Sequence, residues 1–140
     1  MAIIRQQGYK LHVKKELIDI LLKEMTGKPP MKNRLMAVCL LFKDPSYSPS
    51  QGGYHPVEIR LIPHDNHFYF DYITDLAYVG RVYPELEKEL DFSWTQQYVF
   101  HAGLGDLPYR EGCELFKLWQ DNFISYWHMG VYTPTILWES

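Results

Sequence analysis

The sequence has few of the features that mark disulfide-rich, secreted or membrane proteins. Only two cysteines, Cys39 and Cys113, occur in 140 residues, and both lie in apolar patterns. We expect two buried thiols in a reducing compartment, with a disulfide between them as the minor alternative. No apolar run approaches the roughly 18 residues of a membrane span, and the first residues do not resemble a signal peptide. These absences predict a cytoplasmic protein with no membrane association.

Positive charge is also scarce. Lys and Arg together number 14 against 17 Asp and Glu, which gives a net charge of −3. Proteins that bind nucleic acid through phosphates usually carry clustered Lys and Arg and a high pI, so this balance disfavours a nucleic-acid partner. Neither a Gly-Lys-Ser/Thr phosphate loop nor a Gly-x-Ser-x-Gly nucleophile motif is present. The sequence predicts no cofactor.

Aromatic residues, in contrast, are abundant, at 16% of the chain. They comprise 7 Phe, 4 Trp and 11 Tyr, and only Tyr9, Phe42 and Tyr47 precede residue 54. The second part of the chain therefore builds most of an aromatic core or surface. Tyr and Trp are also the residues that form interfaces and small-ligand pockets, so a surplus beyond the core would point to binding.

Hydrophobic periodicity predicts one α+β domain over residues 1–140. Apolar residues at helical spacing indicate helices over 13–25 and 108–128. The segments 33–43, 57–62, 67–73 and 131–138 read as strands, 74–79 continues the third of these, 91–100 is a further strand or hairpin, and 84–90 reads as one or two helical turns. Short links between the middle strands favour a mainly antiparallel sheet of about five strands, with two main helices packed on it.

Two glycine-containing features flank the second predicted helix. Gly112 lies in its apolar stripe, where it would let another element approach closely. Gly103 and Gly105 precede the helix and could form an anion nest, but Asp106 would occupy that place as the helix cap, which is the better explanation.

The loop 44–54 and the residues after it form the first candidate site. Paired glycines at positions 52 and 53 allow a backbone to approach a ligand, and Tyr54 and His55 follow with hydrogen-bonding groups. The alternative is a flexible turn that enters the next strand. Long connections inside compact domains are often functional or disordered.

Charged residues on neighbouring predicted strands form the second candidate site. Glu58 and Arg60 share one strand face, and an antiparallel pairing would bring Asp71 near Arg60, with Asp75 further along the same strand. One carboxylate near another can acquire a raised pKa and serve acid–base chemistry. The alternative is a cross-strand ion pair on the solvent face. Trp94 joins the candidates as an aromatic residue that the core does not obviously need.

A metal site is not expected. His64 and His67 flank a predicted hairpin turn together with Asp65, and side chains in that arrangement point in different directions. Metal sites usually need three or four convergent ligands.

Several runs of residues resemble an uncharacterised bacterial family, the domain of unknown function 2787. These runs are Gly53–Arg60, Tyr72–Gly80, Leu86–Phe92, Trp119–Phe123 and Gly130–Tyr132, and the resemblance as a whole extends over about residues 35–136. The resemblance implies a bacterial protein, often of marine gammaproteobacteria or their mobile gene cassettes. It implies no activity, and it assigns no catalytic residue.

Two functional hypotheses follow. The first is a small non-enzymatic binding or protein-interaction domain with an aromatic-lined pocket or face, a homodimer being its simplest form. The second is a small enzyme that uses Glu58, Asp71, Asp75 or a histidine, with Arg60 holding an anionic substrate. The first is preferred because of the aromatic surplus.

Overall fold

A computed structural model describes residues 3–5, 8–31 and 34–140. It has the order β1 (Ile4–Arg5), α1 (Lys15–Gly27), β2 (Ala37–Lys43), β3 (Val57–His64), β4 (His67–Val79), β5 (Glu85–Ser93), β6 (Tyr98–His101), β7 (Gly105–Asp106), α2 (Tyr109–His128) and β8 (Thr133–Glu139). The sheet runs β7-β6-β5-β4-β3-β2-β8, with β1 pairing in parallel with β4. All other pairings are antiparallel. The expected α+β class and antiparallel sheet are confirmed, but the expected five strands are wrong, because the sheet has eight.

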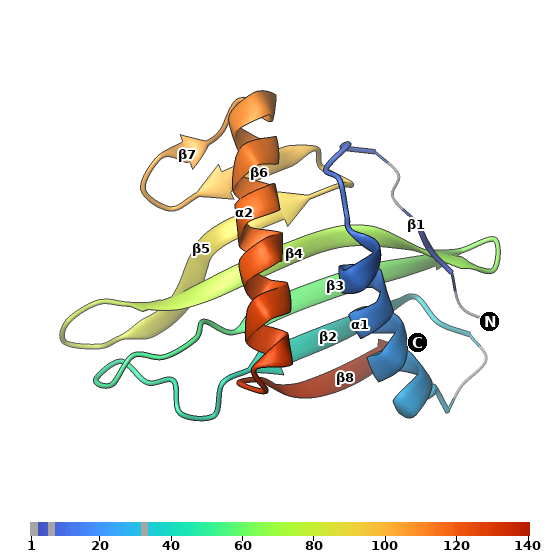
Figure 1. The fold of residues 1–140 in the computed structure, drawn as a ribbon, viewed down its shortest axis with the longest axis horizontal. Helices are drawn as coiled ribbons and strands as arrows, with labels where there is room; N and C mark the ends of the chain where they lie inside the picture. Colours follow the sequence, from blue (N-terminus) through green and yellow to red (C-terminus); the bar gives the residue numbers. More distant parts are fainter. Residues whose placement is uncertain (1–2, 6–7, 32–33) are drawn as a thin grey trace.

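Both helices lie across the same face of the sheet (Figure 1). The core fills this seam, where α1 buries Leu17, Leu21 and Met25 and α2 buries Phe116 and Phe123. We call this side the covered face and the other side the open face. None of the helices in the described part of the chain is long and apolar enough to span a bilayer.

The extra strands come from three places. Residues 84–90, expected as helical turns, belong to β5, which pairs with β4 from Val79↔Glu85 onward. The residues before Asp91 are good helix formers, but pairing with a neighbouring strand overrides that local preference. The predicted 91–100 element is the end of β5 followed by β6, and β1 and β7 contain two residues each, too few to show a periodic pattern.

A β-bulge on β4 changes which aromatic residues reach the core. Arg60 pairs with Tyr72 and Leu61 with Phe70, so Asp71 is the extra residue. Phe70 therefore lies on the covered face and is buried, whereas Tyr72 lies on the open face, where its hydroxyl donates to Glu58 at 2.5 Å. Strict alternation along β4 would put Phe70 and Tyr72 on the same face, and the bulge puts them on opposite faces.

Gly112 is confirmed as a point of close approach between α2 and β6. A Cβ atom at this position would lie 2.9 Å from Cγ2 of Val99. Asp106 is not the helix cap: it belongs to β7, Pro108 stands at the N-cap position, and no side chain caps the helix. The two cysteines are both free and half-buried.

Truncating Phe116 should destabilise the fold strongly. Phe116 is 1% exposed and its ring contacts those of Phe92 and Trp94 edge-on, with ring centroids 5.0 and 5.5 Å away. We expect Phe116→Ala to lower the free energy of unfolding by about 3–5 kcal/mol in urea titrations. Leu118→Ala, two residues away and 60% exposed, is the control and should change it by less than about 0.5 kcal/mol. Equal midpoints for the two variants would show that the seam is not the core.

Candidate functional site

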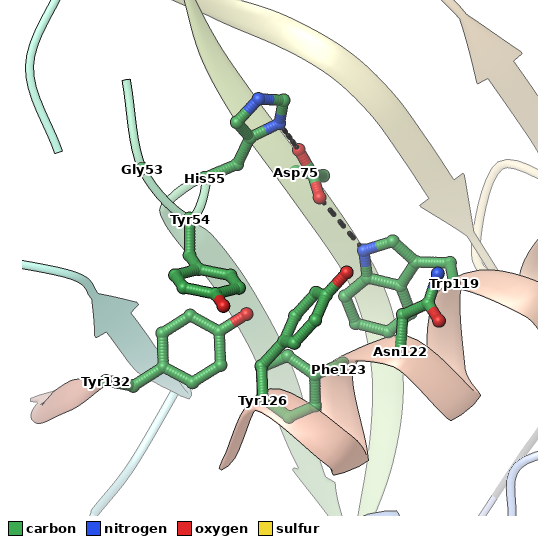
Figure 2. Close-up of a pocket in the computed structure, with 9 residues that line it drawn as sticks. All are labelled: Gly53, Tyr54, His55, Asp75, Trp119, Asn122, Phe123, Tyr126 and Tyr132. Atoms are coloured by element: carbon green, nitrogen blue, oxygen red, sulfur yellow. Dashed lines mark hydrogen bonds and ion pairs between the residues drawn. The ribbon is translucent and has the colours of Figure 1, made fainter. Parts of the chain in front are cut away.

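A pocket of about 240 Å³ opens between the end of the 44–56 connection, the middle of β4 and the second half of α2. Figure 2 shows its residues converging from these segments and from the residue that leads into β8. The lining consists of Gly53, Tyr54, His55, Asp75, Trp119, Asn122, Phe123, Tyr126 and Tyr132. Five of these nine side chains are aromatic rings of Phe, Tyr or Trp.

The carboxylate of Asp75 is the polar centre of the pocket. It is 9% exposed, and its two oxygens have different partners (Figure 2). One oxygen lies 2.7 Å from Nδ1 of His55, and the other accepts a hydrogen bond from Nε1 of Trp119 at 3.0 Å. Asp75 thus joins the connection before β3, strand β4 and helix α2 at one point. Burying a carboxylate is costly unless it is hydrogen-bonded, and both oxygens here are satisfied.

The hydrogen bond to Asp75 raises the pKa of His55 above its ordinary value, against an opposing effect of partial burial. The charge of Glu89 on β5 acts in the same direction as Asp75. The ring of Tyr47 lies beside the imidazole, with 5.5 Å between ring centroids. His55 is therefore held in place from both the loop and the sheet.

The aromatic wall has two parts. Trp119, Phe123 and Tyr132 form a stacked row, with 5.2 Å between successive ring centroids and interplanar angles of 18° and 26°. Tyr54 and Tyr126 form a second, tilted pair with centroids 4.6 Å apart. The two groups line the same cavity.

Three tyrosine hydroxyls in this wall lack a hydrogen-bond partner within the described part of the chain. Figure 2 shows the hydroxyls of Tyr54, Tyr126 and Tyr132 directed toward the inside of the pocket. No other described residue forms a hydrogen bond with them. Burial, and then the charge of Asp75, raise the pKa of Tyr132, so its hydroxyl stays neutral and can donate or accept a hydrogen bond.

The loop that carries Tyr54 is tied down by its own side chains. Asp44 accepts a hydrogen bond from the backbone N–H of Tyr54 at 3.0 Å, and Tyr47 accepts one from the N–H of Tyr78 on β4 at 3.0 Å. Gly53 has a φ of +133°, and a Cβ there would meet the Asp44 carboxylate at 2.8 Å. Glycine at this position therefore lets the loop close over the pocket.

The second group of predicted site residues lies on the open face. Arg60 donates to Asp71 at 2.6 Å and to Glu139 at 3.4 Å, which confirms the expected proximity of Arg60 and Asp71. A separate cavity of about 350 Å³ on this face is lined by Glu58, Asp71 and Tyr72, among others. The buried Asp91, which also lines it, accepts from Thr74 at 2.6 Å and from the hydroxyl of Tyr98. Arg60 does not line this cavity. Its guanidinium is paired with two carboxylates, those of Asp71 and Glu139.

The seven predicted site residues thus fall into three places. Tyr54, His55 and Asp75 come together in the aromatic pocket. Glu58, Arg60 and Asp71 lie on the open face, with the sheet between them and that pocket. Trp94 has no exposed surface and stacks on Phe70 in the core, at 4.9 Å between ring centroids. In the described part of the chain, no three His, Cys, Asp or Glu residues gather as metal ligands would.

In a comparison with protein-family models, residues 15–137 match the model described as "Protein of unknown function (DUF2787)". The chain belongs to this family. All nine pocket residues lie inside the matched segment. A comparison with curated proteins gave no match.

Two solved structures from Vibrio cholerae are similar to this member of the family. The hypothetical protein VC0508 from the VSP-II pathogenicity island is 36% identical, with a TM-score of 0.78 over 89% of this chain and 93% of that one. The conserved hypothetical protein VC1805 from pathogenicity island VPI-2 is 33% identical, with a TM-score of 0.77 over 95% and 100%. VC1805 is described as sharing structural homology with the human P32 protein.

Sequence reasoning missed five residues that line the pocket. They are Trp119, Asn122, Phe123, Tyr126 and Tyr132. Four of them were assigned to the apolar stripe of the second helix or to the residues after it. One signal was available: the C-terminal half of that stripe is much richer in Tyr and Trp than the N-terminal half, and these side chains have polar atoms that need partners.

The His55–Asp75 pair should be visible in a pH titration. The pKa of His55 is raised in the folded state, so the stability that the pair contributes is complete below the unfolded pKa of about 6.5 and declines as pH rises through the folded pKa. We therefore expect Asp75→Asn to lower the His55 pKa in NMR titrations. The stability deficit of Asp75→Asn should be larger near pH ~5.5 than near pH ~8.5.

Asp65→Asn is the matched control, because Asp65 lies in the β3–β4 turn and contacts His64 instead. It should leave the His55 titration where it is. If Asp75→Asn and Asp65→Asn have the same effect on His55, the pair does not form in solution.

Proposed function

We propose that this chain is a small non-enzymatic binding domain that holds a small molecule in the aromatic pocket. The proposal rests on the combination of aromatic walls with three tyrosine hydroxyls that form no hydrogen bond to another described residue. Ligand sites are typically apolar cavities with a few convergent polar groups, and this pocket has that composition.

The size of the pocket limits the ligand. Cavities for drug-sized molecules measure roughly 300–1,000 Å³, and this one measures about 240 Å³. A compact metabolite or a single side group of a larger molecule fits better than a nucleotide or a peptide segment. The Asp75 carboxylate fixes one wall, so the pocket is largely formed before a ligand enters.

The second candidate is a small enzyme that uses acidic residues. The original form of this hypothesis needs Arg60 beside an anionic substrate, yet Arg60 is paired with Asp71 and Glu139 outside both cavities. The His55–Asp75 pair supports a modified form, since a carboxylate on Nδ1 leaves Nε2 available for proton transfer. Figure 2 shows Nε2 directed away from the tyrosines, which favours binding over catalysis.

A homodimer and a cytoplasmic location are further proposals. Within the described chain no strand pairs with the outer edge of β8, and Leu137 on this strand is 63% exposed. A second copy could pair there, although Pro134 lacks the N–H that a full ladder needs. Sedimentation at micromolar concentration tests the dimer, and a strict monomer would remove it.

Filling the pocket mouth should abolish ligand binding. Asn122 is an exposed residue at the rim, so Asn122→Trp adds bulk to the pocket without disturbing the core. A metabolite library screened by NMR should shift the indole N–H signal of Trp119 in the wild type and not in Asn122→Trp. The indole N–H of Trp138, bonded to the carbonyl of Lys28 at 2.7 Å, serves as an internal reference outside the pocket.

Leu118→Trp is the matched variant, because Leu118 is exposed on the same helix outside the pocket. It should bind every hit with wild-type affinity. Hits that bind equally to all three proteins would place the ligand elsewhere and would refute the proposed pocket.

A further inference from the structure

Among the described residues that line the aromatic pocket, the charged groups are Asp75 and, when protonated, His55. No lysine or arginine lines it. Asp75 lies in the wall, Asp44 holds the backbone of Tyr54, and Glu89 acts on His55. An anionic ligand would meet uncompensated carboxylates in a partly dry site, where charge repulsion is stronger than in water.

Aromatic rings favour the opposite charge. The faces of Trp and Tyr rings attract cations, and clusters of such rings with a nearby carboxylate bind ammonium groups in many proteins. The cavity is surrounded by the rings of Trp119, Tyr54, Tyr126 and Tyr132. Asp75 lies in its wall. The free tyrosine hydroxyls can in addition accept hydrogen bonds from N–H groups.

We infer that the pocket binds a small organic cation with an alkylammonium group, its charge balanced by Asp75 and enclosed by the tyrosine and tryptophan rings. This inference rests on the proposed binding function and names its ligand class. A cavity of about 240 Å³ accommodates such a group with a short substituent.

His55 makes this site sensitive to pH. The groups that face it are Asp75 on β4, Glu89 on β5 and the ring of Tyr47 in the connection before β3. Protonated His55 neutralises Asp75 and places a positive charge at the pocket edge, whereas neutral His55 leaves the carboxylate charge available to a ligand. Binding of a cation should therefore strengthen as pH rises through the His55 pKa, and binding of a neutral molecule should not.

The test compares molecules of equal shape and different charge. Choline and its uncharged isostere 3,3-dimethylbutan-1-ol form one pair, and n-butylammonium and 1-butanol form the other. The shift of the Trp119 indole signal gives the affinity of each probe. We expect the cation of at least one pair to bind about tenfold more tightly than its neutral partner, since cation–π and carboxylate attraction together are of that order.

Asp75→Asn should reduce this preference to about threefold, because only the aromatic rings then favour the cation, whereas Asp65→Asn, with its charge change outside the pocket, should keep it. The ratio within a pair is the readout, so a general loss of fold would lower both affinities and leave the ratio interpretable. Neutral probes that bind as well as cations, or cations that bind no better at high pH than at low pH, would overturn the inference.

The outcomes separate this inference from the proposed function. If neither cation binds but the library yields ligands that Asn122→Trp excludes, the pocket is a ligand site of another class and only the cation is wrong. If no ligand of any class depends on Asn122, the proposed function fails as well.

Discussion

The buried carboxylate of Asp75 is the constraint on which the site depends. A charged group with 9% exposure is tolerated only where its oxygens are satisfied, and the satisfying groups come from two other parts of the chain. Trp119 brings α2 to β4, and His55 brings the end of the 44–56 connection to the same point. Removing either partner would leave a buried oxygen of Asp75 without a hydrogen bond. This cost holds α2, β4 and the end of the 44–56 connection together.

The aromatic residues then divide between two tasks. Most of them form the seam between the sheet and the helices, where Phe42, Phe70, Phe92, Trp94 and Phe116 have almost no exposed surface. Rings with hydroxyl groups gather at one end of the seam instead, at Tyr54, Tyr126 and Tyr132. A phenol fully enclosed in a hydrocarbon core would lack a partner, so these residues suit the margin, where a cavity begins.

Sequence periodicity could predict the helices, the central strands and the antiparallel class, because those elements bury a regular stripe or alternate strictly. It failed where pairing between strands decided the outcome. The segment before Asp91 has the composition of a helix but is held as a strand by β4, and the bulge at Asp71 puts Phe70 and Tyr72 on opposite faces. Neither effect is encoded in a local pattern, since both arise from residues on a neighbouring strand.

The candidate site was also predictable only in part. Tyr54, His55 and Asp75 stood out as polar residues in unusual settings, whereas the α2 side of the pocket looked like core. Arg60 and Asp71 formed the expected pair, but the sheet separates that pair from His55, and no strand pattern alone reveals which side the helices cover.

This separation also explains the chemistry of the two faces. On the open face Arg60 is paired with two carboxylates, so its guanidinium is not free for an anionic substrate. On the covered face the partners of Asp75 are the titratable His55 and the neutral Trp119 indole, so in the proposed site its charge acts on a ligand whenever His55 is neutral.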